Sequence, residues 1–132
     1  MTTRSVLFGC ALATALVGSA AIANADTPKS ASQDCFFARN WQGSTAPDGK
    51  TLYLRVDSHD VYRVDLQGDS FLLRGPNWHL INREHGPSTI CSPIDLDLQV
   101  SDGSGFVEPL IAKSIVKLTP EQVAAIPKKF AP

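Results

Sequence analysis

Alternating apolar and polar residues in the middle of the chain predict a pair of short β-strands. Residues 51–56 ("TLYLRV") place a leucine or valine at every second position, and residues 61–66 ("VYRVDL") repeat the alternation. A period of two puts successive apolar side chains on one face of a strand. The polar stretch "DSHD" lies between the two segments. The pattern therefore predicts a β-hairpin over residues 51–66.

Later segments extend this pattern and define a fold class. Residues 93–100 ("PIDLDLQV") place four apolar side chains on one predicted face and acidic or amide side chains on the other. Residues 110–118 predict a last strand, with Lys113 and Lys117 facing outward. Turn residues recur about every eight to twelve positions, which favours a mainly β fold. We expect a small antiparallel barrel or sandwich of about six short strands, because closing or stacking the sheet covers its edges.

One short C-terminal helix is predicted in "LTPEQVAAIP". Thr119 is the expected N-cap, Pro120 occupies the first helical position and Gln122 completes a capping box. Pro127 should end the helix after about two turns. The basic tail "KKFAP" that follows has no function that the pattern indicates.

The first residues form a predicted signal peptide rather than part of the fold. Arg4 precedes a small-residue apolar run over 5–23, and "ANA" then fits an A-x-A cleavage site after Ala25. An uncleaved anchor helix is the alternative, since the run approaches the length that spans a bilayer. Cleavage would leave a lead-in over 26–34, which we expect to be flexible, and a single β-rich domain over 35–132. The predicted location is the periplasm or the medium.

Charge and motif content exclude several classes of partner. Without Arg4 the chain has 11 basic and 13 acidic residues, a net charge of −2. No basic stripe is present that would bind nucleic acid or an anionic membrane surface. The sequence also lacks G-x-S-x-G, H-E-x-x-H and P-loop motifs. We therefore expect no cofactor and no stable membrane insertion after cleavage.

The cysteines predict a disulfide. Cys10 would leave with the signal peptide, so that Cys35 and Cys91 remain as an even pair in an oxidising compartment. The alternative is two free or intermolecular thiols. A Cys35–Cys91 bond would close a loop of roughly 57 residues and contribute about 4 kcal/mol in the chain-entropy model. It would also remove both sulfurs as nucleophiles or metal ligands.

The stretch "NWHLINREHG" is the strongest candidate for a metal site, and its spacing argues against one. His79 and His85 are six residues apart, which is not a recurring zinc-ligand spacing. A third ligand would have to come from His59 in the hairpin loop. We expect no metal site, and interpret this stretch as a polar rim around a half-buried Trp78.

Two further groups of side chains could carry chemistry or binding. Asp95 and Asp97 would lie about 6.5 Å apart on one strand face, a spacing that suits a carboxylate pair but is more typical of a wet sheet face. Arg55 and Arg63 would face each other across the hairpin, which requires a carboxylate such as Asp65 or a bound anion. Solvated arginines are the more common arrangement. We expect no catalytic residues.

The order of several motifs resembles an uncharacterised family of small exported bacterial proteins. The motifs are "CFFARNWQG", "KTLYLRV", "VYRVDLQG", "TICSPIDLDLQV" and "IVKLTPEQVAAI", which together span nearly the whole mature chain. The resemblance implies an exported β-rich domain without an established activity, cofactor or catalytic residue. The chain departs from the family pattern at two places. Relatives have a further cysteine where this chain has Ser70, and another within the segment "GFVEPL".

Together these features predict an exported, non-enzymatic module that binds a protein, glycan or other component of the cell envelope. Tyr53 and Trp78 are candidate surface aromatics for such a contact, with Arg55 and Arg63 as the candidate anion or partner contacts. An inhibitor of a periplasmic hydrolase, presenting a rigid loop near residues 75–85, is one alternative. The other is an enzyme without a recognisable motif. Its acid–base groups would come from Asp95, Asp97, His79 and His85.

Overall fold

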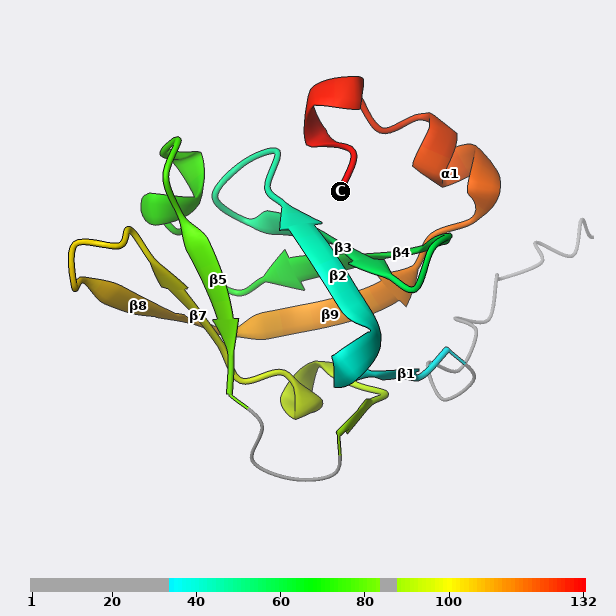
Figure 1. Ribbon diagram of the computed structural model, residues 1–132, viewed down its shortest axis with the longest axis horizontal. Helices are drawn as coiled ribbons and strands as arrows, with labels where there is room; N and C mark the ends of the chain where they lie inside the picture. Colours follow the sequence, from blue (N-terminus) through cyan, green and yellow to red (C-terminus); the bar gives the residue numbers. More distant parts are fainter. Residues whose placement is uncertain (1–33, 84–87) are drawn as a thin grey trace, which may run out of the picture.

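A computed structural model describes residues 34–83 and 88–132 as a mainly β fold of nine strands in three antiparallel sheets (Figure 1). The predicted signal peptide, nearly all of the predicted lead-in and His85 lie outside the described residues. The fold class predicted from the sequence is confirmed in its sandwich form, with more strands than expected. Among the described residues the sheets do not close into a barrel.

The main sheet has four strands in the order β2-β3-β4-β9. Their bounds are β2 (Trp41–Thr45), β3 (Thr51–Val56), β4 (Asp60–Leu66) and β9 (Ala112–Lys117). β3 and β4 form the hairpin that the alternation predicts, paired from Thr51 opposite Asp65 to Val56 opposite Asp60. The sequence therefore determined this element through its period of two.

Two smaller sheets complete the sandwich. One has the order β5-β7-β8, with β5 (His79–Asn82), β7 (Leu98–Ser101) and β8 (Val107–Leu110). The other pairs β1 (Phe36–Phe37) with β6 (Thr89–Ile90). Figure 1 shows β5, β7 and β8 to one side of the main sheet and β1 below it. Pro109 lies in β8, an edge strand, where a missing N–H costs least.

The core lies between the main sheet and the smaller ones. Leu52, Leu54 and Val64 from the hairpin and Leu98 and Val100 from β7 are almost completely buried. Phe36, Tyr62 and Ile90 belong to the same cluster, so that all three sheets contribute to one core. Continuous burial of this kind supplies most of the favourable free energy of folding.

The helical segments of the described residues are all short. They are the 3₁₀ turns η2 (Ala38–Asn40), η3 (Leu72–Arg74), η4 (Pro93–Asp95) and η5 (Lys128–Phe130), and the helix α1 (Pro120–Ala124). The Thr119 hydroxyl accepts from the Gln122 N–H and the Gln122 side chain accepts from the Thr119 N–H, which confirms the predicted capping box. Over the described part of the chain, no helix has the length and apolar character needed to cross a membrane.

The predicted strand over residues 93–100 is wrong in its first half. Residues 93–95 form η4, and β7 begins only at Leu98. Ile94 is 90% exposed instead of sharing the buried face with Leu96 and Leu98. The reason is a local turn. The backbone N–H and the hydroxyl of Ser92 both donate to the Asp95 carboxylate, and Pro93 occupies the first position of the turn. A capped turn therefore replaces the start of the strand.

The predicted outward direction of Lys117 is also wrong. β9 pairs Ala112 with Leu66 but Ser114 with Asp65, so one extra residue is inserted as a β-bulge. A bulge shifts the alternation of every side chain that follows it. Lys113 is exposed as predicted, whereas Lys117 lies opposite Tyr62 on the inner face of the sheet, at its rim.

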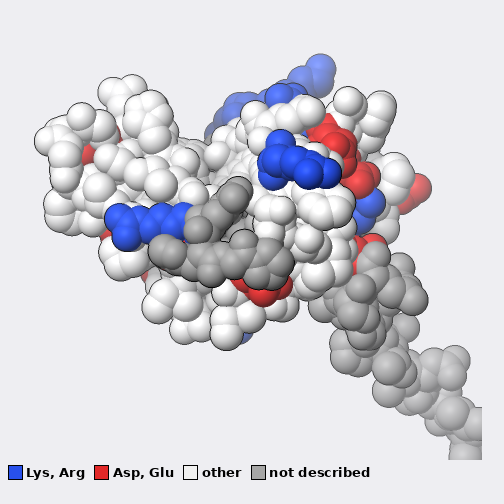
Figure 2. Space-filling view, turned by 60° about the horizontal axis from the view of Figure 1, so that its bottom comes forward, with Lys and Arg blue, Asp and Glu red and all other residues white. Residues whose placement is uncertain are grey.

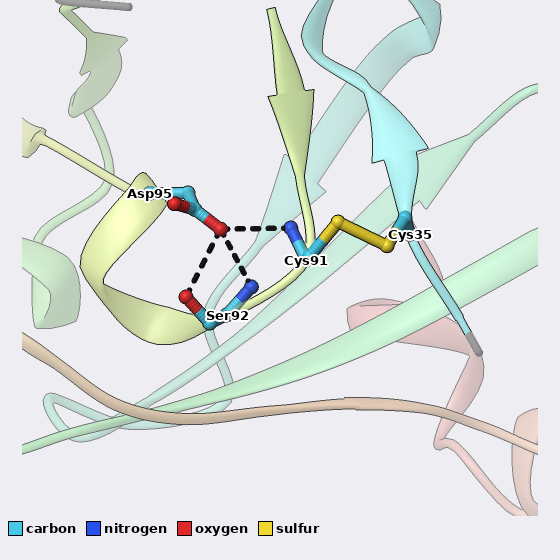
Figure 3. The surroundings of a disulfide bond; sticks show 4 residues. All are labelled: Cys35, Cys91, Ser92 and Asp95. Carbon is cyan, nitrogen blue, oxygen red and sulfur yellow. Dashed lines mark hydrogen bonds between the residues drawn. A yellow bond between two sulfur atoms is a disulfide. The ribbon is translucent and has the colours of Figure 1, made fainter. Parts of the chain in front are cut away.

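The predicted disulfide is confirmed. Cys35 and Cys91 are bonded, with a separation of 56 residues (Figure 3). The bond joins the residue before β1 to the residue after β6, so that it fixes the small two-stranded sheet against the core. Neither sulfur is a thiolate, and neither is a nucleophile in this state.

Candidate functional site

The outer face of the hairpin does not hold two opposed arginines as predicted. Arg63 lies opposite Tyr53, and Arg55 lies opposite Val61. The Arg63 guanidinium instead pairs with Asp65, two residues along β4, at 2.8 Å. Both side chains are about half-exposed, so solvent screens the pair. Arg63 thus has the carboxylate neighbour that the sequence suggested, and needs no bound anion.

Arg55 is shielded by the C-terminal segment of the chain. Its Nη1 donates to the main-chain oxygen of Pro132 at 3.4 Å, and the Thr45 hydroxyl donates to the Phe130 carbonyl at 2.5 Å. Figure 1 shows this segment folded back beside β2 and β3. The Arg55 Nε is buried without a hydrogen-bond partner. The tail for which the sequence indicated no function therefore covers one of the predicted contact residues.

The histidines do not form a metal site in the described residues. His79 is exposed on β5, His59 is exposed in the hairpin loop and His85 lies outside the described residues. No group of three potential ligands is present among the described histidine, cysteine, aspartate and glutamate side chains. Trp78 is half-buried against the core, and it lines an open hollow of about 500 Å³ with His79 and Phe130.

Asp95 has a structural role, and the predicted pairing with Asp97 on one strand face is wrong. Its Oδ2 accepts from the Cys91 N–H at 2.9 Å, the Ser92 N–H at 2.8 Å and the Ser92 hydroxyl at 3.0 Å (Figure 3). These hydrogen bonds, the one from Cys91 first, lower the pKa of the Asp95 carboxyl. The carboxylate therefore stabilises the turn that follows the disulfide. Asp97 lies outside that turn.

A different hollow, next to the disulfide, combines polar side chains with apolar walls. It has a volume of about 300 Å³ and opens at the rim of the inner face of the main sheet. We call it the Tyr62 pocket. Its lining residues come from β4, β6, β9, the start of α1 and the disulfide: Asp34, Tyr62, Ile90, Cys91, Ile115, Val116, Lys117, Thr119 and Gln122.

Tyr62 is the central residue of this pocket. It is only 3% exposed, and its ring packs against Phe36 with 4.6 Å between the ring centroids. Its hydroxyl makes no hydrogen bond to any residue of the described chain. Burial raises the pKa of this hydroxyl, so Tyr62 is neutral at physiological pH. Among the described residues, the buried side-chain atoms without a hydrogen-bond partner are Arg55 Nε and Asn82 Oδ1, so the Tyr62 hydroxyl is open to the pocket and to solvent.

Lys117 lies at the polar edge of the pocket and is paired with Asp60. The Lys117 Nζ donates to Asp60 Oδ2 at 2.6 Å and lies 6.0 Å from the centroid of the Tyr62 ring. The hydrogen bond from the ammonium to Asp60 raises the pKa of Lys117. Asp60 and Tyr62 share one face because they are two residues apart in β4. The β9 bulge brings Lys117 onto that face.

The chemistry of the Tyr62 pocket suits binding better than catalysis. Its walls are mostly apolar, and its sulfur belongs to the disulfide. The ammonium of Lys117 is charged and already paired, so it is neither a nucleophile nor a base. A concave apolar site with a few converging polar groups is the usual form of a ligand site.

Sequence patterns missed this site for a specific reason. The alternation over residues 61–66 places Tyr62 on the same face as Val64 and Leu66, so the pattern indicates a core residue. Lys117 was predicted to face solvent, and Asp60 to lie in a loop. A tyrosine, a lysine and an aspartate share a rim only because a bulge interrupts β9, and no turn residue in "AKSIVK" indicates it.

Ser70 contacts the segment "GFVEPL". Ser70 is buried, and its hydroxyl donates to Glu108 Oε2 at 2.9 Å. Glu108 belongs to this segment, in which the resemblance predicts a second additional cysteine for relatives.

The surface and the comparisons with known proteins give no further assignment. On the face shown in Figure 2, lysine and arginine side chains form separate groups within a largely uncharged surface. No family model, curated protein or solved structure matches the chain.

Proposed function

We propose that this chain is an exported, non-enzymatic domain that binds another component of the cell envelope through the Tyr62 pocket. One observation carries the proposal: an almost completely buried tyrosine lines a mostly apolar hollow, and its side chain makes no hydrogen bond to another described residue. A bound partner that fills the hollow would cover this hydroxyl, and leaving a buried polar group unpaired costs about 1–3 kcal/mol. A partner that completes the hydrogen bond is therefore favoured over one that does not.

Two features support export. The first is the N-terminal segment, in which Arg4 precedes an apolar run and an A-x-A site. The second is the Cys35–Cys91 disulfide, because such bonds persist mainly in oxidising compartments. Intact mass of the protein from a periplasmic fraction should correspond to a chain that starts at Asp26. A mass that includes residue 1 would contradict export with cleavage.

Several polar side chains that could act in catalysis are already held in hydrogen bonds, an ion pair or a disulfide. This supports a role without catalysis. Asp95 is held by three hydrogen bonds in a turn, Arg63 is paired with Asp65, and both sulfurs are bonded. Among the described residues, His79 belongs to no group of three potential metal ligands. General acid–base chemistry needs positioned groups that are free to exchange protons with a substrate.

Site-specific photo-crosslinking in intact cells tests the proposal. Val116 lines the pocket and is 52% exposed, whereas Val107 on β8 is 43% exposed and lies on the other sheet. Each valine is replaced separately by p-benzoylphenylalanine, and adducts are identified by mass spectrometry after irradiation. We expect a defined adduct from position 116 and none of the same mass from position 107.

Two results would reject the proposal. One is the same adduct pattern at both positions, which would show nonspecific contact. The other is the absence of an adduct at position 116 in a protein that is exported and folded, as checked by its intact disulfide.

A further inference from the structure

The charges around the Tyr62 hydroxyl select the kind of ligand that the pocket can take. Asp34 and Lys117 are the charged side chains that line the pocket, and the Lys117 ammonium is paired with Asp60. Two carboxylates thus accompany one ammonium. The ion pair with Asp60 further reduces what Lys117 offers to an incoming anion. The pocket therefore disfavours a carboxylate or phosphate and favours a cation.

The apolar lining and the volume of the pocket limit the shape of a cation that it can bind. Ile90, Ile115 and Val116 provide an apolar lining between the disulfide and Lys117. At about 300 Å³ the pocket is at the lower end of the range for ligand sites. A single unbranched aliphatic chain with a charged end fits these limits. Such chains bury their methylene groups along apolar surface and keep the charged group at a polar edge.

The Tyr62 hydroxyl provides the matching acceptor. A phenolic oxygen can accept a hydrogen bond as well as donate one, and an ammonium has only donors. The hydroxyl is neutral, because burial raises its pKa, and it has no partner among the described residues. Asp34 lines the same pocket and offers a carboxylate to the same charge.

We infer that the Tyr62 pocket binds an alkylammonium group, of the kind that a lysine side chain of a partner polypeptide presents. The aliphatic stem would lie on Ile90, Ile115 and Val116, and the ammonium would donate to the Tyr62 hydroxyl and to Asp34. This inference rests on the proposed function, since it names the chemistry recognised at the same site. A free polyamine has the same chemistry, and the experiment below separates the two sources.

The test uses the two tyrosines of the chain as separate reporters. Protein carrying ¹³C in its tyrosine rings is titrated with Nα-acetyl-lysine-N-methylamide, and the signals of Tyr62 and Tyr53 are followed by NMR. The matched control is the norleucine analogue, which has a similar stem and ends in a methyl group. We expect the lysine probe to shift Tyr62 saturably and to leave Tyr53 unchanged, with at least about tenfold weaker binding of norleucine.

Two substitutions should change the affinity in opposite directions. Asp60→Asn removes a negative charge and releases Lys117 from its ion pair, so it should weaken binding of the lysine probe several-fold. Lys117→Met removes the competing ammonium, so it should strengthen binding several-fold. Both side chains are partly exposed, and neither variant removes core packing. Opposite signs would not result from a general loss of structure.

The outcomes are distinct. Tighter binding of cadaverine than of the lysine probe would assign the site to a free amine, and the reverse would assign it to a polypeptide; both support the inference. Equal binding of norleucine, or tighter binding of the corresponding glutamate probe, would overturn it. A specific adduct at position 116 without any amine binding would leave the proposed function in place and reject the alkylammonium ligand alone.

Discussion

The two faces of the β3–β4–β9 sheet carry similar residues in different surroundings. On the outer face Tyr53 lies opposite Arg63, which pairs with Asp65. On the inner face Tyr62 lies opposite Lys117, which pairs with Asp60. Both sets consist of a tyrosine, a basic residue and an aspartate. The outer set is an ordinary solvated sheet surface, whereas two members of the inner set, Tyr62 and Lys117, line a hollow.

This difference shows that position on the pleat, rather than residue type, decides which set can bind. Tyr62 and Arg63 are neighbours in β4, yet one belongs to the core cluster and the other to the surface. Water satisfies the polar groups of the outer set at little cost. Only the inner set includes an almost completely buried side chain that lines a hollow, which is why we propose that a ligand binds there.

The disulfide should stabilise the inner side most strongly. Replacing both cysteines by serine should lower the free energy of unfolding by about 4 kcal/mol, because the loop between residues 35 and 91 is then open in the unfolded chain. Urea denaturation of the double variant measures this loss. Reducing agent should lower the stability of the wild-type protein by a similar amount and leave the variant unchanged. A loss below about 1 kcal/mol would mean that the bond does not constrain the unfolded chain.

The two tyrosines should differ in their contribution to stability. Tyr62→Ala should cost about 3–5 kcal/mol, because it removes a ring packed between Phe36 and the core. Tyr53 is half-buried on the outer face, so Tyr53→Ala should cost roughly 1 kcal/mol. Chemical denaturation of the two variants gives the comparison. Equal losses would contradict the distinction between the faces.

The raised pKa of Tyr62 predicts that the protein loses stability at alkaline pH. We expect this loss to be smaller than the losses from removing the disulfide or the Tyr62 ring. Burial raises this pKa above the ordinary value of 10.0. Between the two pKa values the unfolded chain has lost a proton that the folded chain keeps, so stability falls as pH rises. The contribution is complete below pH 10.0 and is lost as the pH rises through the folded pKa. Unfolding of wild type and Tyr62→Phe at increasing pH should show a steeper decline for wild type, and parallel curves would contradict the shift.

The sequence predicted the parts of this fold that follow from local patterns. The hairpin followed from alternation, the capped helix from Thr119 and Gln122, and the disulfide from an even cysteine count. The strand expected from Pro93 failed because a hydrogen-bonded turn around Asp95 competes with it. The pocket could not be predicted, because it depends on a bulge in β9 and on pairing between strands distant in sequence.

The most direct test of binding at the Tyr62 pocket is the yield of the crosslinked adduct at position 116 in two variants. One variant lacks the Tyr62 hydroxyl of the inner face, and the other lacks the Tyr53 hydroxyl of the outer face. Tyr62→Phe and Tyr53→Phe make the same chemical change. The folded protein gives the Tyr62 hydroxyl no described partner, so Tyr62→Phe should not lower stability. We expect it to reduce the adduct by about tenfold, the ratio that corresponds to 1.4 kcal/mol, and Tyr53→Phe to leave the adduct unchanged. An undiminished adduct in Tyr62→Phe, or a loss in Tyr53→Phe alone, would contradict binding at the Tyr62 pocket.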